Sequence, residues 1–240
     1  DSRYGEFWVG ARPTLEEMSK MTGLRCDSID NLPDALAKDL GQVTLRVVPQ
    51  SDARIESEVH ELRARAEIAA NAEEADAELS EALSEIRLCK DAWEAREMQS
   101  AVNRTREGFD NIIASFPRAI GHRRGERVVE GAFGAKAREE GNGLGYETIA
   151  AAGNHANTLH FIDNDGTLKP GELILVDAGI EVDSLYTADI TRTLPINGTF
   201  SQPQAEVYQA VLDAAEYALE VAQKPGCKFR DIHAAAMEVI

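Results

Sequence analysis

Residues 172–194 read ELILVDAGIEVDSLYTADITRTL, and this segment organises the rest of the chain. It begins with an apolar run that ends in Asp177 and continues after Tyr186 with the Thr and Ile residues that strands prefer. A turn near Asp183, between the two halves, predicts a β-hairpin. Because residues equidistant from the turn of a symmetric hairpin lie opposite each other, Asp177 is predicted to face Asp189 with Cβ atoms roughly 5 Å apart.

The two aspartates lie where strands disfavour them, and two neighbouring carboxylates repel each other. One divalent cation, or two cations about 3.5–4 Å apart, would remove the repulsion. The alternative interpretation is a pair of solvated acids beside the turn. The sequence context argues against it: Asp177 follows four aliphatic residues and precedes Ala178-Gly179, a small pair that lets another group approach closely, and apolar residues flank Asp189. We therefore predict a metal site.

The motifs in and around the hairpin carry a resemblance to a known family. LVDAG followed by ADITRT resembles the metal-binding hairpin of the pita-bread metallopeptidases (family M24), and most of all that of aminopeptidase P (Xaa-Pro aminopeptidase). Residues 146–149, 153–154 and 159–161 upstream and residues 194–200 downstream agree with that pattern. The similarity covers residues 88–240 well and the preceding residues more loosely. The combination of motifs is specific, whereas a single DAG would carry no weight.

The resemblance implies an α/β (α+β) fold with two domains. Residues 1–86 would form a small, partial creatinase-like α/β domain, and residues 87–240 would form the incomplete first half of a pita-bread catalytic domain. The residue pattern adds short strands at residues 5–10, 43–48 and 159–162. Because the chain begins without Met and ends inside a predicted helix, we expect it to be truncated at both ends.

The resemblance also implies roles for individual residues. Asp177 and Asp189 would bind two divalent metal ions. His160 would be catalytic, contacting the substrate and hydrogen-bonding the tetrahedral intermediate. Tyr146 would lie beside the metals and bind substrate, and the Thr191 hydroxyl would support the metal ligands from outside. Taken alone, each of the last three also reads as an ordinary strand residue, so these roles rest on the resemblance.

Further ligands are expected outside this sequence. In the family, a His and two Glu from later strands complete the dinuclear site and a Glu acts as proton shuttle, and we expect these residues beyond residue 240. Two carboxylates alone are a weak site for a transition metal, so residues 1–240 by themselves should be inactive. Oxygen-rich ligation favours Mn²⁺, with Co²⁺ and Zn²⁺ left open. His155 matches no family ligand and is interpreted as a loop residue.

Composition excludes several classes of partner. A net charge of −17 would repel nucleic-acid phosphates, and no apolar run approaches the roughly 20 residues that span a bilayer. The three cysteines are far apart and form no disulfide framework, which predicts reduced thiols in a cytoplasmic protein. The resemblance implies a homo-oligomer, because relatives often assemble as dimers or tetramers.

The activity that the resemblance implies is hydrolysis of the bond between an N-terminal residue and a following Pro, through a metal-activated hydroxide. Prolidase, which cleaves Xaa-Pro dipeptides, remains an alternative. Creatinase uses the same scaffold without metal, and the retained Asp177 and Asp189 argue against it. The extra N-terminal domain argues against methionine aminopeptidase. A non-catalytic protein that binds peptides or partners on this fold is the alternative of a different class. The presence or loss of the His and Glu ligands beyond residue 240 would separate it from an enzyme.

Overall fold

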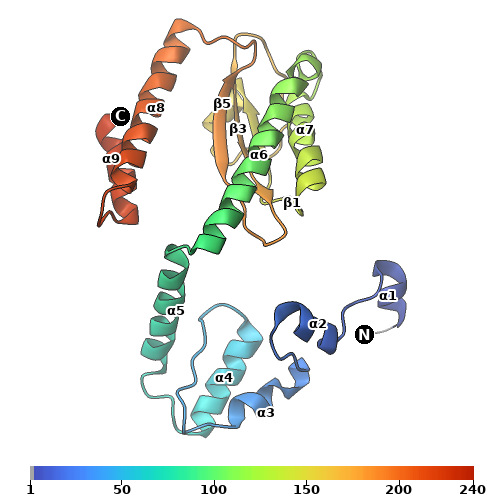
Figure 1. Cartoon of the computed structure of the whole chain (residues 1–240), viewed down its shortest axis with the longest axis vertical. Helices are drawn as coiled ribbons and strands as arrows, with labels where there is room; N and C mark the ends of the chain where they lie inside the picture. The colour runs from blue at the N-terminus through green and yellow to red at the C-terminus, as the bar shows by residue number, and fades with distance from the viewer. Residues whose placement is uncertain (1–2) are drawn as a thin grey trace. The chain divides into compact units, whose positions relative to one another are not determined.

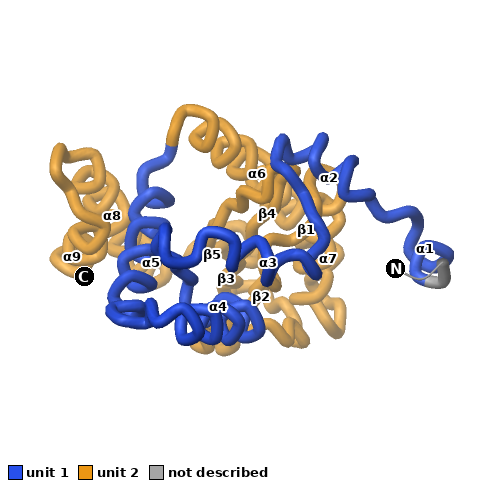
Figure 2. The backbone as a smooth tube through the Cα atoms, turned by 90° about the horizontal axis from the view of Figure 1, so that it is seen from below, with its two compact units in different colours: residues 1–90 blue, residues 91–240 orange. Residues whose placement is uncertain are grey.

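The computed structural model describes residues 3–240, without the side chains of residues 3 and 4, and combines helices with a small sheet (Figure 1). This mixture confirms the predicted α/β (α+β) class. The chain divides into two compact units, residues 1–90 and residues 91–240 (Figure 2). Within the part of the chain that is described, no helix is long and apolar enough to cross a membrane.

Unit 1, residues 1–90, is helical over its described part. Its elements are α1 (Arg3–Val9), α2 (Leu15–Thr22), the 3₁₀ turn η1 (Ile29–Asn31), α3 (Leu32–Ala37), α4 (Ala53–Arg65) and α5 (Ala72–Leu88). Local chemistry sets where α2 begins. The Thr14 hydroxyl accepts a hydrogen bond from the Glu17 N–H, and the Glu17 carboxylate accepts one from the Thr14 N–H. This reciprocal capping box satisfies two N–H groups that a helix start otherwise leaves unpaired.

The predicted strand at residues 5–10 is wrong, because this segment belongs to α1 and its end. Gly10 adopts a φ of 84°, and its N–H donates to the carbonyl oxygen of Glu6 at 2.8 Å. A glycine in this left-handed conformation is a common way to end a helix. The apolar side chains that suggested a strand, Phe7 and Trp8, are exposed.

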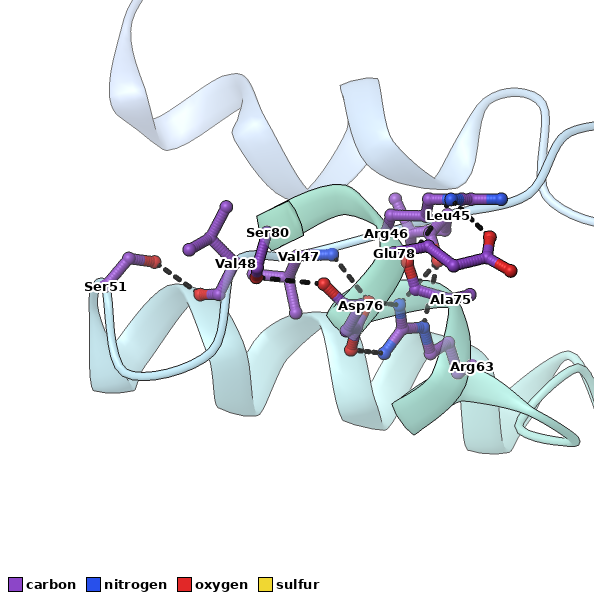
Figure 3. Close-up of polar contacts among 10 residues, drawn as sticks. All are labelled: Leu45, Arg46, Val47, Val48, Ser51, Arg63, Ala75, Asp76, Glu78 and Ser80. Atoms are coloured by element: carbon purple, nitrogen blue, oxygen red, sulfur yellow. Dashed lines mark hydrogen bonds and ion pairs between the residues drawn. The ribbon is translucent and has the colours of Figure 1, made fainter. Parts of the chain in front are cut away.

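The predicted strand at residues 43–48 is also wrong, because side chains occupy the backbone groups that a neighbouring strand would need (Figure 3). The Leu45 carbonyl accepts hydrogen bonds from Nε and Nη2 of Arg63 at 3.1 and 2.5 Å. The Val47 N–H donates to Oδ1 of Asp76 at 2.9 Å. The segment is therefore pinned between α4, which carries Arg63, and α5, which carries Asp76.

Arg63 and Asp76 form a buried ion pair with each other. Two guanidinium nitrogens lie 2.8 and 2.6 Å from the two carboxylate oxygens, and only 2% of Arg63 and 4% of Asp76 are exposed. The hydrogen bonds from Arg63 hold the pKa of Asp76 below its ordinary value. Removal of either side chain would leave the other as an uncompensated buried charge.

Replacement of Asp76 by Asn should lower the free energy of unfolding of unit 1 by about 3–5 kcal/mol, because the Arg63 charge stays buried without its partner. Glu78→Gln is the matched control on the same helix. Glu78 pairs with Arg46 at 3.0 Å in a more exposed position, where an ion pair contributes about 0–1 kcal/mol. Hydrogen exchange of α4 and α5 in increasing denaturant measures both losses, and equal losses would contradict this ranking.

Acid should weaken the same pair in a defined direction. Because the folded-state pKa of Asp76 is lowered, its contribution to stability is fully present above the ordinary carboxyl pKa of about 4. The contribution is lost as the pH falls through that value toward the lower folded-state pKa. The difference in thermal stability between wild type and Asp76→Asn should therefore shrink from about pH 7 to about pH 3. A difference that stays constant over this range would contradict the lowered pKa.

Unit 2, residues 91–240, contains a three-stranded antiparallel sheet of order β2-β3-β5 and a separate pair of β1 with β4. Its helices are α6 (Ala92–Ala119), α7 (Gly125–Glu140), the 3₁₀ helix η2 (Gly153–Asn157), α8 (Gln202–Ala222) and α9 (Phe229–Val239). Its strands are β1 (Gly143–Leu144), β2 (Ile149–Ala152), β3 (Leu173–Ala178), β4 (Ile180–Glu181) and β5 (Ile190–Pro195). Helices α8 and α9 pack against each other (Figure 1).

The core of unit 2 lies where α6 and α7 cover the sheet (Figure 1). Strand β3 buries every second side chain completely, namely Ile174, Val176 and Ala178. These side chains cluster with large apolar residues of the two helices, which are Phe109, Ile112, Phe116, Val129 and Phe133. Because successive side chains of a strand point to opposite faces, Asp177 points away from this core.

The central hairpin forms as predicted, but its register is centred on Ser184, one residue later than predicted. Asp177 lies opposite Thr191. The prediction that Asp177 directly faces Asp189 is therefore wrong by two residues along the returning chain. The two aspartates still share one face, because side chains two residues apart in an extended chain point the same way.

Candidate active site

The two aspartates meet at the hydroxyl of Tyr146. The phenol oxygen lies 2.6 Å from Oδ1 of Asp177 and 3.1 Å from Oδ1 of Asp189. The second carboxylate oxygen of Asp177, Oδ2, accepts a hydrogen bond of 2.7 Å from the Thr191 hydroxyl. The structure thus brings together four of the five residues singled out in the sequence. A phenol has one proton to give, so the two carboxylates share a single donor and keep oxygen atoms available.

The phenol of Tyr146 stays protonated in this setting. Burial of the ring raises its pKa, and the hydrogen bond to Asp177 raises it further, far above the ordinary tyrosine value. Tyr146 is therefore a neutral hydrogen-bond donor that orients the carboxylates without cancelling their charge. Because the aspartates hold all the formal charge of the group, the cluster attracts cations.

Gly179 makes the close approach of the two chains possible. A Cβ atom placed on it would lie 1.7 Å from the carbonyl oxygen of Ala188 and 3.0 Å from the ring of Tyr146. Ala188 immediately precedes Asp189, so any residue larger than glycine would push that aspartate away. This confirms the prediction that the small pair Ala178-Gly179 admits a neighbouring group.

The tip of the hairpin is fastened to the start of α6. The Tyr186 hydroxyl donates to Oε1 of Glu94 at 2.5 Å, and the Ser184 hydroxyl donates to Oε2 of Glu97 at 2.7 Å. The bond to Glu94 raises the pKa of Tyr186 to about 12. The ring of Trp93 also packs edge-on against Tyr186, with centroids 5.8 Å apart. These contacts fix where the chain turns back and so where Asp189 arrives.

His160 lies outside this cluster of hydrogen bonds. The predicted strand at residues 159–162 is wrong, because His160 falls in a turn after η2. Its side chain is exposed, and among residues 3–240 its ring forms no hydrogen bond to Asp177, Asp189 or any other side chain.

A second polar cluster, around Glu126, was missed in the sequence. Glu126 is completely buried in the first turn of α7, and His155, interpreted as a loop residue without a role, lies with its Nδ1 2.9 Å from Oε1 of Glu126. Asp165 completes a group whose possible ligand atoms all lie within 4.8 Å of one another. No spacing in the sequence links these residues, since helix α7 meets the segment after β2 only in the folded chain.

The two clusters differ in the kind of hydrogen bond that their carboxylate oxygens already accept. Each oxygen of Glu126 already accepts a backbone N–H, from Ala152 at 2.7 Å and from Gly166 at 2.5 Å. Asp177 and Asp189 receive only hydroxyl donors within the described chain, and such donors rotate aside easily. The aspartate pair is therefore the better candidate for binding a cation.

Comparison with known proteins identifies the family. The family model described as metallopeptidase family M24 matches residues 60–240. Xaa-Pro aminopeptidase 2 of Streptomyces coelicolor is 45% identical over 233 residues, which cover 97% of this chain and 47% of that protein. Xaa-Pro aminopeptidase 3 of Mus musculus is 29% identical, over 98% of this chain and 46% of that protein. The chain belongs to metallopeptidase family M24, and it spans about half the length of the curated relatives it matches.

Solved structures support the same assignment at the level of fold. The Pseudomonas aeruginosa aminopeptidase PepP superimposes with a TM-score of 0.81 at 27% identity, over 100% of this chain and 54% of that one. A zinc-substituted Escherichia coli aminopeptidase P in complex with product gives a TM-score of 0.79 at 23% identity, over 100% of this chain and 55% of that one. The fold is accordingly that of the pita-bread peptidases.

Replacement of Gly179 by Ala should destabilise unit 2 by about 1–3 kcal/mol, because the added methyl group collides with the Ala188 carbonyl. Gly131→Ala is the matched control. Gly131 lies exposed in α7, where an added Cβ meets nothing within 4 Å, and alanine there should stabilise by about 0.5–1 kcal/mol. Thermal unfolding of both variants measures the effects, and a neutral Gly179→Ala would show that the hairpin can open without loss.

Proposed function

We propose that the full-length protein is a metal-dependent aminopeptidase that hydrolyses the peptide bond between an N-terminal residue and a following Pro. The observation that carries this proposal is the convergence of the Asp177 and Asp189 carboxylates on the hydroxyl of Tyr146. Membership of family M24 and relatives named Xaa-Pro aminopeptidase support it.

The donor set of the hairpin suits hard divalent cations. It consists of oxygen atoms alone, from two carboxylates and the hydroxyls beside them. Such ligands favour Mn²⁺ over metals that prefer thiolate, and we propose that Asp177 and Asp189 hold two Mn²⁺ ions. When bound, these ions supply Lewis-acid polarisation of a carbonyl oxygen and a lowered pKa of water.

The chain's own residues orient the ligands and the substrate. By donating to Oδ2 of Asp177, the Thr191 hydroxyl sets the rotation of that carboxylate. Tyr146 holds the opposite oxygen and presents its ring beside the substrate. The exposed imidazole of His160 is available to hydrogen-bond the peptide carbonyl and to stabilise the charge of the tetrahedral intermediate.

The remaining parts of the proposal concern the rest of the protein. We assign residues 1–86 to a creatinase-like N-terminal domain and residues 87–240 to the first half of the catalytic domain, whose remaining His and two Glu ligands lie outside this sequence. The three cysteines, Cys26, Cys89 and Cys227, are all free, which supports a cytoplasmic location. The proposed partners are peptides with Pro at the second position and further copies of the same chain.

The proposal is tested with the full-length protein, Mn²⁺ and an X-Pro-Y tripeptide, beside an X-Ala-Y tripeptide and an X-Pro dipeptide. Release of the first residue should require both Pro and metal. Asp189→Asn should lower kcat/KM by more than the roughly 10–100-fold that loss of an outer partner of a metal ligand costs. Mass spectrometry of the released products and a direct titration with Mn²⁺ measure cleavage and binding separately.

Two further variants test whether the Thr191 hydroxyl contributes to activity. Thr191→Val should lower kcat/KM by about 10–100-fold through the lost bond to Asp177. Thr193→Val is its matched control, since Thr193 lies opposite Leu175 in the register and should leave activity unchanged. Cleavage of the dipeptide alone would identify a prolidase. Absence of both cleavage and Mn²⁺ binding would overturn the enzyme and leave a peptide- or partner-binding protein.

A further inference from the structure

The segment that carries His160, residues 153–167, runs from the end of β2 to the turn before β3, and we call it the His160 segment. Strand β2 is the edge of the sheet, so one row of its N–H and C=O groups has no strand to pair with. Buried backbone groups need partners. The His160 segment and α7 provide those partners through side chains.

Two side chains take the place of a fourth strand beside β2. Asn164, fully buried, accepts a hydrogen bond from the Ala150 N–H at 3.0 Å and donates to the Thr148 carbonyl at 2.8 Å. Glu126 accepts from the Ala152 N–H at 2.7 Å. Three outward-facing backbone groups of this edge, the N–H groups of Ala150 and Ala152 and the carbonyl of Thr148, therefore have partners without a neighbouring strand.

Glu126 joins the two ends of the His160 segment. One carboxylate oxygen binds the N–H of Ala152, immediately before the segment, and the other binds the N–H of Gly166 at 2.5 Å, near its end. The backbone N–H of Glu126 also donates to the Gly166 carbonyl at 3.1 Å. A Cβ on Gly166 would lie 2.7 Å from the carboxylate, so the contact requires glycine. One fully buried carboxylate thus closes a loop of about 15 residues.

His155 extends this closure toward His160. Because a carboxylate only accepts hydrogen bonds, the bond of 2.9 Å to Glu126 assigns the ring proton to Nδ1 of His155. The imidazole also packs against the ring of Phe161 in a tilted arrangement, with centroids 4.2 Å apart and planes at 31°. Phe161 is the neighbour of His160 in sequence. A continuous set of contacts therefore runs from the buried carboxylate to the residue beside His160.

We propose that Glu126 and His155 are positioning residues for His160. The inference rests on the proposed function, in which His160 stabilises the tetrahedral intermediate. Without the closure, His160 would sample more positions relative to the aspartate pair. Since His160 acts on the intermediate more than on the bound peptide, loss of the closure should reduce kcat and leave KM nearly unchanged.

The same residues could instead form a second metal site with Asp165, because their ligand atoms lie within 4.8 Å of one another. The contacts favour positioning. Both oxygens of Glu126 and Nδ1 of His155 are already engaged in hydrogen bonds, and Asp165 is exposed at the rim of an open pocket of about 390 Å³. Positioning requires Glu126 and His155 only, whereas a metal site requires Asp165 as well.

The first test measures the segment directly and needs no activity. In the full-length protein, Glu126→Gln should raise amide hydrogen exchange in residues 153–167 by about 10–100-fold. Gln keeps one acceptor oxygen but turns an NH2 group toward the N–H at the other end of the segment, so one hydrogen bond is lost and the other is no longer charge-assisted. Exchange in β3 and α6 should stay as in the wild type. Asp165→Asn is the matched control in the same cluster and should leave exchange unchanged. Unchanged exchange in Glu126→Gln would overturn the closure.

The second test uses His155, which is partly exposed and less able to disrupt folding. His155→Ala removes the hydrogen bond and the ring, and kcat for the X-Pro-Y tripeptide should fall about 10–100-fold with KM within about twofold. His155→Asn keeps an N–H donor near the position of Nδ1 and should recover kcat to within about threefold of wild type. A change confined to KM, or a failure of Asn to rescue, would overturn the role of His155.

The outcomes distinguish a failure of the proposed aminopeptidase function from a failure of the positioning role of Glu126 and His155. A wild type that cleaves no X-Pro-Y peptide would overturn the proposed function, while the exchange data alone would still support or overturn the closure. Binding of Mn²⁺ or Zn²⁺ that is lost in Asp165→Asn and retained in Asp189→Asn would identify a second metal site and overturn positioning. Recovery of kcat in His155→Asn, together with unchanged hydrogen exchange in Asp165→Asn, would support the positioning role.

Discussion

The repulsion between Asp177 and Asp189 is the constraint around which unit 2 is built. Both carboxylates approach one phenol oxygen to within 3.1 Å. Two unit charges about 5 Å apart repel each other by roughly 3 kcal/mol at an effective dielectric constant of 20. One shared hydroxyl proton offsets only part of that. The remaining repulsion is opposed by the fold of the hairpin. Its register, the contacts at its tip and the close approach at Gly179 hold the two carboxylates near each other. In the proposed metal site, a bound cation would offset this repulsion.

In both units, a buried carboxylate accepts hydrogen bonds from backbone groups that would otherwise pair with a neighbouring strand. In unit 1, Asp76 and its partner Arg63 satisfy the backbone of the segment at residues 43–48. In unit 2, Glu126 and Asn164 satisfy the outer edge of β2. A carboxylate can accept several hydrogen bonds at once, so a single side chain can hold two stretches of backbone that are distant in sequence. This arrangement covers a sheet edge without extending the sheet.

The same side chains explain what could and could not be predicted from the sequence. The hairpin of β3 and β5 was predictable because its pattern is local: an apolar run, a turn and a return strand. Tyr146, Asp177, Asp189 and Thr191 were found together because the motifs that carry the resemblance include them. The centre of the turn was missed by one residue, and the pairing of Asp177 therefore by two, since the turn is set by contacts of Ser184 and Tyr186 with α6. The strand predicted at residues 43–48 failed because an alternating pattern gives no sign that a distant Arg63 and Asp76 will bind its backbone. The strand predicted at residues 159–162 failed because this apolar segment lies in the turn and loop that follow η2.

A tyrosine between the two aspartates suits the proposed metal site. A lysine or arginine there would form strong ion pairs and neutralise the carboxylates, and its charge would then compete with any cation. A phenol whose pKa is raised by burial and by Asp177 keeps its proton, so it donates without adding positive charge. The pair therefore remains ordered while it retains its full negative charge. Thr191 obeys the same rule on the other side of Asp177, since its hydroxyl also orients without neutralising. Neutral donors around paired acids are what the proposed metal site would require, in contrast to the ion pair of Arg63 and Asp76, in which a cationic side chain already neutralises the carboxylate.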